Sequence, residues 1–362
     1  MKNKYLFIPI IISILLISSS CQQGKKEVLS QKEEANIHFN LGNEYFQLGK
    51  TDKAVEEWRR AASLVPEDVA SIGNIAIVLY TNGNRKEAVE LWQKVLKVKP
   101  DDAFTLNNIG NYYRDTGNYE EAVKCYKRAL EVFPAYYMPH YNLGLIHYEK
   151  KEYDLAMVEF KRAIELNPQD AYSHYIIGNI HRDRRDMENA RKEWQTAINI
   201  YPKFSQAKFE IANHLNSEGK VDDAIAELES IIKNDPKFAS AYASLGFILL
   251  DKGDVDKAVE ILTRGEKMNK EGNKRFYYLD GLGWANYKKG DYKESLKHLQ
   301  EAINLTPVME TRYLAKEYYH IGMVYKETGN KTLARQSFEK ALELERDKEF
   351  IADIKGILIK LT

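Results

Sequence analysis

Proline recurs every 34 residues through the middle of the chain, at Pro66, Pro100, Pro134, Pro168, Pro202 and Pro236. Proline ends helices because it lacks a backbone N–H and its ring clashes with the preceding turn. A fixed period of this length predicts tandem copies of one small supersecondary unit, each burying its apolar face against its neighbours. The 362 residues therefore need not divide into separate globular domains.

Small and bulky residues follow the same period. The repeats begin at residues 35, 69, 103, 137, 171, 205 and 239, and near 276 and 315, and their position 20 is always Ala or Ser. Position 8 is equally small, with Gly42, Ala76, Gly110, Gly144, Gly178, Ala212, Gly246, Gly283 and Gly322. Position 24 is bulky, with Trp58, Trp92, Tyr126, Phe160, Trp194, Leu228, Leu262, Leu299 and Phe338. Because positions 20 and 24 share one helical face, each repeat is expected to pack large side chains beside small ones.

A glycine separates the two halves of most repeats, whereas Lys151 and Arg185 take its place in repeats four and five. Glycine readily adopts the left-handed backbone conformation that ends many helices. Each repeat is thus predicted to consist of a helix, a short turn, an antiparallel helix and a closing proline.

These residues resemble the tetratricopeptide repeat over roughly Ala35 to Arg346. The resemblance implies an all-α fold, a right-handed α-solenoid of about nine helix-turn-helix repeats whose first helices line a concave groove. The repeats would span residues 35–68, 69–102, 103–136, 137–170, 171–204, 205–238, 239–272, 276–309 and 315–346. Residues 347–362 are amphipathic and are expected to form a capping helix, because the end of a solenoid must be covered.

The first 20 residues have the order of a secretory signal. Lys2 and Lys4 precede an apolar run at residues 5–17, then come three serines and Cys21. The run is shorter than the roughly 20 residues of a membrane-spanning helix. The segment resembles a bacterial lipoprotein signal, although Ser18 stands where that family usually has Leu. This implies lipidation of Cys21 and a flexible tether at residues 21–34; an ordinary signal and a retained anchor helix are the alternatives.

The resemblance places positions 2, 5, 6, 9 and 12 of each first helix in the groove. An Asn amide there offers both a donor and an acceptor to a peptide backbone. A similar asparagine ladder in the repeats of certain glycosyltransferases grips extended polypeptide, whereas the alternative is that these amides bind a neighbouring helix. Position 6 supplies Asn40, Asn74, Asn108 and Asn142, and position 9 supplies Asn43, Asn111, Asn179 and Asn213.

Beyond repeat three the same positions become aromatic, and Tyr141, Tyr148, Tyr175 and Trp284 are predicted to anchor a bound peptide. Aromatic side chains give a large contact area at low entropic cost. Other aromatic groove candidates include Phe209, Phe247 and Tyr277. Arg114 and Arg182, at position 12, are candidates to pair with an acidic group of the ligand.

The sequence favours no catalytic chemistry, metal or cofactor. It contains no HExxH motif, nucleophile elbow, phosphate-binding glycine loop or dinucleotide fingerprint. His140 and His147, like His174 and His181, stand seven residues apart, about 10 Å along a helix, which is too far for two ligands of one ion. Lys plus Arg equals Asp plus Glu, at 53 each, so no electrostatic footprint for nucleic acid results.

The sequence therefore predicts a non-catalytic scaffold that binds a protein or peptide partner in its groove and assists the assembly of a complex. It is expected to be exported and held by a lipid in the bacterial cell envelope, at the outer membrane, on its periplasmic or surface face. A surface-exposed adhesin and an anchored regulator of a cell-wall enzyme are the alternatives. Neither the identity of the partner nor the oligomeric state follows from the sequence.

Overall fold

The computed structural model describes residues 29–268 and 274–361, which form an all-α solenoid of helices joined by short turns. The expected signal segment, Cys21 and tether residues 21–28 lie outside the described residues. Within those residues, no helix is both long and apolar enough to cross a bilayer. The helices are α1 (Gln31–Gln47), α2 (Thr51–Leu64), α3 (Val69–Thr81), α4 (Arg85–Val98), α5 (Ala103–Asp115), α6 (Tyr119–Val132), α7 (Tyr137–Glu149), α8 (Tyr153–Leu166), α9 (Ala171–Asp183), α10 (Met187–Ile200), α11 (Ser205–Ser217), α12 (Val221–Asn234), α13 (Ala239–Lys252), α14 (Val255–Met268), α15 (Arg275–Lys289), α16 (Tyr292–Leu305), α17 (Thr311–Glu327), α18 (Lys331–Leu344) and α19 (Lys348–Lys360).

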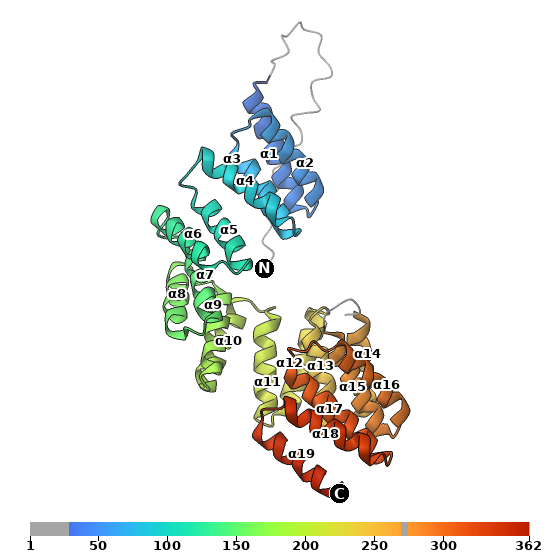
Figure 1. The fold of residues 1–362 in the computed structure, drawn as a ribbon. Coiled ribbons are helices and arrows are strands. Elements are labelled where there is room, and N and C mark those ends of the chain that lie inside the picture. Colours follow the sequence, from blue (N-terminus) through green and yellow to red (C-terminus); the bar gives the residue numbers. More distant parts are fainter. Residues whose placement is uncertain (1–28, 269–273, 362) are drawn as a thin grey trace, which may run out of the picture. The chain divides into compact units, whose positions relative to one another are not determined.

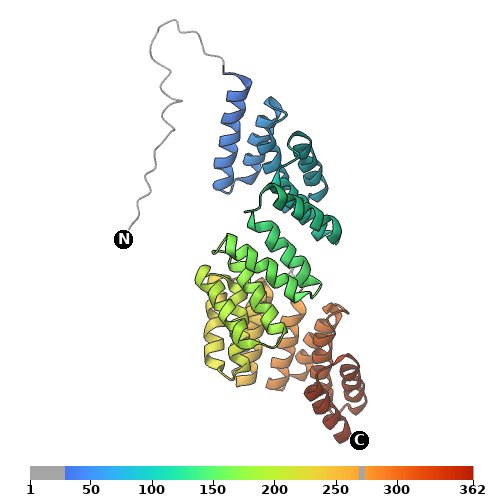
Figure 2. The ribbon, with the colours of Figure 1, turned by 90° about the vertical axis from the view of Figure 1, so that its left-hand side faces the viewer.

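The chain divides into an N-terminal unit, up to residue 142, and a C-terminal unit, from residue 143 onward. In both, a first helix packs against the second helix of its own hairpin, as α5 does against α6 and α15 against α16. Figure 1 and Figure 2 show the hairpins of each unit following one another in chain order. In the C-terminal unit, α15 also contacts the two neighbouring first helices, α13 and α17. Corresponding positions of these three helices therefore lie near one another.

The ends of the helices follow from local sequence. Most second helices end two residues before a proline, as α2 does at Leu64 before Pro66, whereas no proline follows α14 or α18. Several first helices begin after an Asp whose carboxylate accepts a hydrogen bond from a backbone N–H, as Asp102 does from Thr105. Such caps satisfy donors that the first helical turn leaves unpaired.

Close contact between small and bulky residues holds each hairpin together. A Cβ atom added to Gly110 would lie 2.5 Å from Cε1 of Tyr126, and one added to Gly178 would lie 2.5 Å from Cδ1 of Trp194. Both rings are completely buried. No side chain fits at these glycines without moving a ring, so the small residue sets the distance between the two helices.

Two turns carry an unusual residue in the left-handed conformation. The turn glycines have φ between 71° and 92°, and Lys151 and Arg185 adopt the same conformation, with φ of 60° and 64°. For residues with a Cβ this region costs roughly 1–2 kcal/mol. The predicted turn geometry is thus retained in repeats four and five, at the expense of backbone strain.

The described ends of the array differ from the sequence-based boundaries. α1 begins at Gln31, behind a capping box formed by Ser30 and Glu33, so residues 31–34 are helical and not part of a flexible tether. α17 begins at Thr311, four residues before the expected start of the last repeat. In α19, Ile354 is completely buried and packs in a cluster with Phe338 of α18.

Candidate functional site

The asparagines at position 9 bind the aromatic residue of their own repeat. Trp58 Nε1 donates to Asn43 Oδ1 at 3.1 Å, and Trp194 Nε1 donates to Asn179 Oδ1 at 3.0 Å. In the same way, the Tyr126 hydroxyl donates to Asn111 Oδ1 at 2.8 Å. A buried polar atom needs such a partner, so these three amides have a structural role without any ligand.

Repeats six and two lack this hydrogen bond, because each has only one of the two residues that form it. Repeat six has Leu228 at position 24, which carries no polar atom, and its Asn213 is exposed to solvent. Repeat two has Trp92 at position 24 but Ile77 at position 9. Among the described residues, buried Trp92 Nε1 accordingly has no hydrogen-bond partner.

The position-6 asparagines are divided between two environments. Asn74 Nδ2 donates to Asn43 Oδ1 at 3.3 Å, and buried Asn142 donates to Asn107 Oδ1 at 2.9 Å. These bonds connect the first helices of successive repeats. Asn40 is exposed and Asn108 is half-buried. Neither side chain forms a hydrogen bond with another described residue.

The two predicted arginines lie within internal networks. Arg114 Nη1 donates to Asn142 Oδ1 at 2.9 Å, and its Nη2 lies 3.1 Å from a carboxylate oxygen of Asp115. Arg182 Nη1 lies 2.9 Å from Glu210 Oε2 on the next first helix. An acidic ligand group would have to compete with these partners.

The predicted aromatic anchors are half-buried, and they are Tyr141, Tyr148, Tyr175 and Trp284. The Tyr175 ring lies 5.1 Å from the buried Phe204 ring, between ring centroids. Trp284 stacks on His320, with 4.3 Å between ring centroids. Their rings therefore stabilise the helix array and expose part of their surface as well.

Three of the histidines considered as metal ligands, His147, His174 and His181, each contact a carboxylate. Within residues 29–268 and 274–361, no three His, Cys, Asp or Glu side chains come together as a metal site requires. The pairs are His147 with Glu152, His174 with Glu193 and His181 with Asp186, at 2.6, 2.6 and 3.1 Å from Nδ1 to the carboxylate oxygen.

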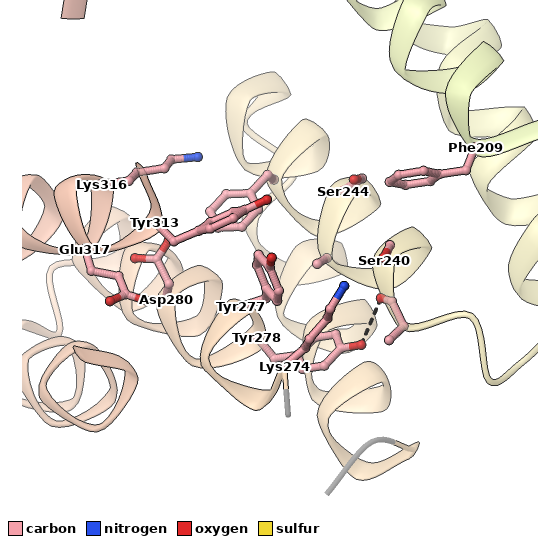
Figure 3. Close-up of a pocket in the computed structure, with 13 residues that line it drawn as sticks. Phe209, Ser240, Ser244, Lys274, Tyr277, Tyr278, Asp280, Tyr313, Lys316 and Glu317 are labelled. Atoms are coloured by element: carbon pink, nitrogen blue, oxygen red, sulfur yellow. Dashed lines mark hydrogen bonds between the residues drawn. The ribbon is translucent and has the colours of Figure 1, made fainter. Parts of the chain in front are cut away.

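A cavity of about 340 Å³ opens between the first helices of the C-terminal unit (Figure 3). Phe209 of α11 lies at one side, and the rest of the lining comes from α13, α15 with its N-cap residue Lys274, and α17. Many of the lining residues stand at positions 2, 5, 6 and 9 of their repeats, which the sequence places in the groove. Its aromatic lining consists of Phe209, Phe247, Tyr277, Tyr278 and Tyr313.

Two lysines lie over the aromatic rings of this cavity. The Lys316 ammonium is 4.0 Å from the centroid of the Phe247 ring, and the Lys274 ammonium is 5.9 Å from that of Tyr277. Tyr277 and Tyr313 meet edge to face, with 4.4 Å between centroids. Burial, together with the Tyr313 hydroxyl, raises the pKa of Tyr277, so this ring stays uncharged at physiological pH. The cavity wall thus has the composition of a cation–π site.

Acidic side chains lie at the opposite side of the cavity from Phe209 (Figure 3). Asp280 Oδ1 lies 2.6 Å from His320 Nδ1, and both side chains are buried. Glu317 is 1% exposed, and the Thr306 hydroxyl donates to its Oε1 at 2.6 Å. Glu317 Oε2 is covered and has no hydrogen-bond partner among the described residues. Burial, with a contribution from Asp280, raises the pKa of Glu317 to about 8.

Among the aromatic residues that line this cavity, Phe209, Phe247 and Tyr277 are groove candidates from the sequence, whereas Tyr278, Tyr313 and the acidic residues are not. The four predicted anchors, Tyr141, Tyr148, Tyr175 and Trp284, do not line it. Glu317 stands two residues after Ala315, at position 3 of its repeat. Several other repeats have a small, buried residue there, such as Ser71, Ser173 or Ala207, and none has an acidic one. A carboxylate at a position that holds no charged residue in any other repeat is the sequence signal that could have identified the site.

Five family models, each described as a tetratricopeptide repeat, match the chain. They cover residues 107–171 and 159–203, 67–135, 35–68 and 276–307, 215–281, and 315–348. The matches together span well over half of the chain. No curated protein gives a significant match.

The chain is also similar to solved structures. A Pseudomonas aeruginosa structure, described as a functional characterization of pilF, is 21% identical, covering 57% of this chain and 95% of that chain, with a TM-score of 0.50. A structure of MamA, residues 41 to the end, from Desulfovibrio magneticus RS-1 is 19% identical, covering 48% of this chain and 97% of that chain, with a TM-score of 0.40. The first likeness supports the fold and no particular activity.

We predict that Ile77→Asn stabilises the protein by about 1 kcal/mol, because the new amide gives Trp92 Nε1 an acceptor. Ile77 is 42% exposed, so little apolar contact is lost. The reciprocal variant Asn179→Ala should destabilise by about 1–3 kcal/mol, since it leaves Trp194 Nε1 buried without a partner. Chemical denaturation followed by circular dichroism measures both. A loss of stability in Ile77→Asn would contradict this account of position 9.

We also predict that stability falls as the pH rises from about 5 to about 8. The folded protein keeps a proton on Glu317 that the unfolded chain releases near pH 4.5, so ionisation favours unfolding by a few kcal/mol across this range. Glu317→Gln should flatten this dependence, whereas Glu327→Gln, on an exposed carboxylate of the same helix, should retain it. Equal pH dependence in all three proteins, measured by denaturation midpoints, would refute the assignment.

Proposed function

Because the chain belongs to the tetratricopeptide-repeat family, a family of protein-interaction scaffolds, we propose that it is a non-catalytic scaffold that binds an extended polypeptide segment along its first helices. The segment inserts a side chain into the cavity between α11, α13, α15 and α17. The cavity itself is the observation that carries this proposal, because it combines aromatic walls at groove positions with the buried carboxyl groups of Asp280 and Glu317. Pockets of this composition and size are typical of ligand sites.

The asparagine ladder contributes less to this proposal than the cavity. Asn74 and Asn142 are already bonded to neighbouring first helices. Among the position-6 asparagines, Asn40 and Asn108 are those whose amides can reach a peptide backbone without losing an internal bond. We therefore assign them a supporting role, in which they hold the main chain of a segment in the N-terminal unit.

We further propose that the scaffold is exported and held in the cell envelope by a lipid on Cys21, where it assists the assembly of a complex. The order of charged, apolar and small residues before Cys21 supports this part of the proposal. A lipid at the N-terminus would keep the repeats near the membrane and concentrate them close to envelope partners.

The cavity is tested by filling it. Ser244→Trp, on the cavity wall, should abolish recovery of a stoichiometric protein partner from detergent-solubilised cell envelope, because the new ring occupies the space of the bound side chain. Glu260→Trp, at an exposed position of α14, is the matched control and should recover the partner as the wild type does. Recovery by Ser244→Trp would place the binding site elsewhere, and recovery of no partner by the wild type would refute the scaffold.

The anchor is tested by Cys21→Ser. This substitution removes the thiol that accepts the lipid, so the protein should move from the membrane fraction to the soluble fraction on ultracentrifugation. Immunoblotting of both fractions gives the distribution. A variant that stays in the membrane fraction would show that the apolar run at residues 5–17 is retained as the anchor.

A further inference from the structure

The Glu317 side chain is not explained by the packing of the repeats. It is 1% exposed, it is the only acidic residue at position 3 among the nine repeats, and its Oε2 has no donor within the described part of the chain. Leaving a buried acceptor unpaired costs about 1–3 kcal/mol. Glu317 also lines the cavity, so a molecule bound there that displaces the side chains covering Oε2 can supply the missing donor.

The aromatic wall next to it already accepts ammonium groups. The protein's own Lys316 places its Nζ 4.0 Å from the centre of the Phe247 ring, well within the range of a cation–π contact. Lys316 is exposed, so its head group is free to exchange with water or with another cation. The ring therefore provides a cation site that a ligand can take over.

The charges around the cavity distinguish a basic ligand from an acidic one. Lys274 and Lys316 lie at the surface, where water solvates them and no ligand is required. Asp280 and Glu317 are buried. His320 contacts the Asp280 carboxylate, and the Thr306 hydroxyl donates a hydrogen bond to Glu317. A buried carboxyl without a full set of partners gains more from a ligand than an exposed lysine does.

The geometry points to a basic anchor: we propose that the bound polypeptide segment inserts a lysine or arginine side chain between the aromatic walls, directed toward Asp280 and Glu317. This inference rests on the proposed function and specifies its ligand. The stem of the inserted side chain packs on Tyr277 and Phe247, and its charged end displaces the Lys316 ammonium. The cavity, about 340 Å³, has room for one such side chain together with adjoining main chain.

The experiment begins with selection from a display library of short random peptides on the full-length protein, with counter-selection on Ser244→Trp. The expected outcome is enrichment of peptides that share a Lys or Arg at one position. Enrichment of an acidic or purely apolar anchor instead would overturn the inference and leave the scaffold intact. Failure to enrich any peptide would refute the proposed function, and the inference with it.

The best peptide is then compared with a copy in which norleucine replaces the shared lysine, or citrulline the shared arginine. Loss of the charge should weaken binding about tenfold or more in isothermal titration calorimetry, the equivalent of one charge-assisted hydrogen bond. Glu317→Gln should remove most of this difference. Equal affinity of the two peptides for the wild type would overturn the inference.

Lys316→Met provides an independent criterion, because its effect has opposite signs for the two kinds of ligand. If the anchor is basic, removing the competing ammonium strengthens binding several-fold; if the anchor is acidic, binding weakens. Lys257→Met, at an exposed position of α14, is the matched control and should not change the affinity. Circular dichroism shows whether Glu317→Gln folds. If it does not, the Lys316→Met comparison and the uncharged peptide still decide between a basic and an acidic anchor.

Discussion

The contact between a small residue at position 8 and a bulky residue at position 24 is the constraint on which the rest of the structure depends. It fixes how closely the two helices of a hairpin approach, as Gly178 and Trp194 show. Since each hairpin also packs against the next, this spacing is transmitted along each unit. Solenoid stability is approximately the sum of such local interfaces, so repetition of one contact is sufficient to build the array.

The same contact determines which groove residues are available for binding. A Trp or Tyr at position 24 brings a buried N–H or O–H, and Asn at position 9 supplies the acceptor in three repeats. Repeats six to eight have Leu at position 24, namely Leu228, Leu262 and Leu299. Their position 9 therefore does not need to supply a hydrogen-bond acceptor. Two of these repeats place Phe247 and Trp284 there, and Phe247 lines the cavity. In repeats seven and eight, the aliphatic residue at position 24 thus leaves position 9 open to an aromatic side chain.

The period predicted the helices, their ends at proline and the position of the left-handed turns, because these depend on local sequence. It did not predict the hydrogen-bond partners of the asparagines. An Asn at position 9 looks the same in the sequence whether its amide binds a peptide or, as in Asn43, the indole N–H of Trp58. Nor did it identify Glu317 and His320, which lie on α17 and act with groups on other helices. Such sites depend on contacts between repeats, and a pattern within one repeat does not contain them.

A solenoid can accommodate a costly group such as the Glu317 carboxyl because its interfaces are nearly independent. Burial raises the pKa of this group to about 8, which means that its ionised form opposes folding. In a globular domain with one core, this penalty would weaken the whole structure, whereas here it falls mainly on the contacts between α15 and α17. The clusters around Trp58 and Trp194 lie elsewhere in the chain and do not share it. A repeat array can therefore place a strained binding group at one interface while the remaining interfaces keep the protein folded.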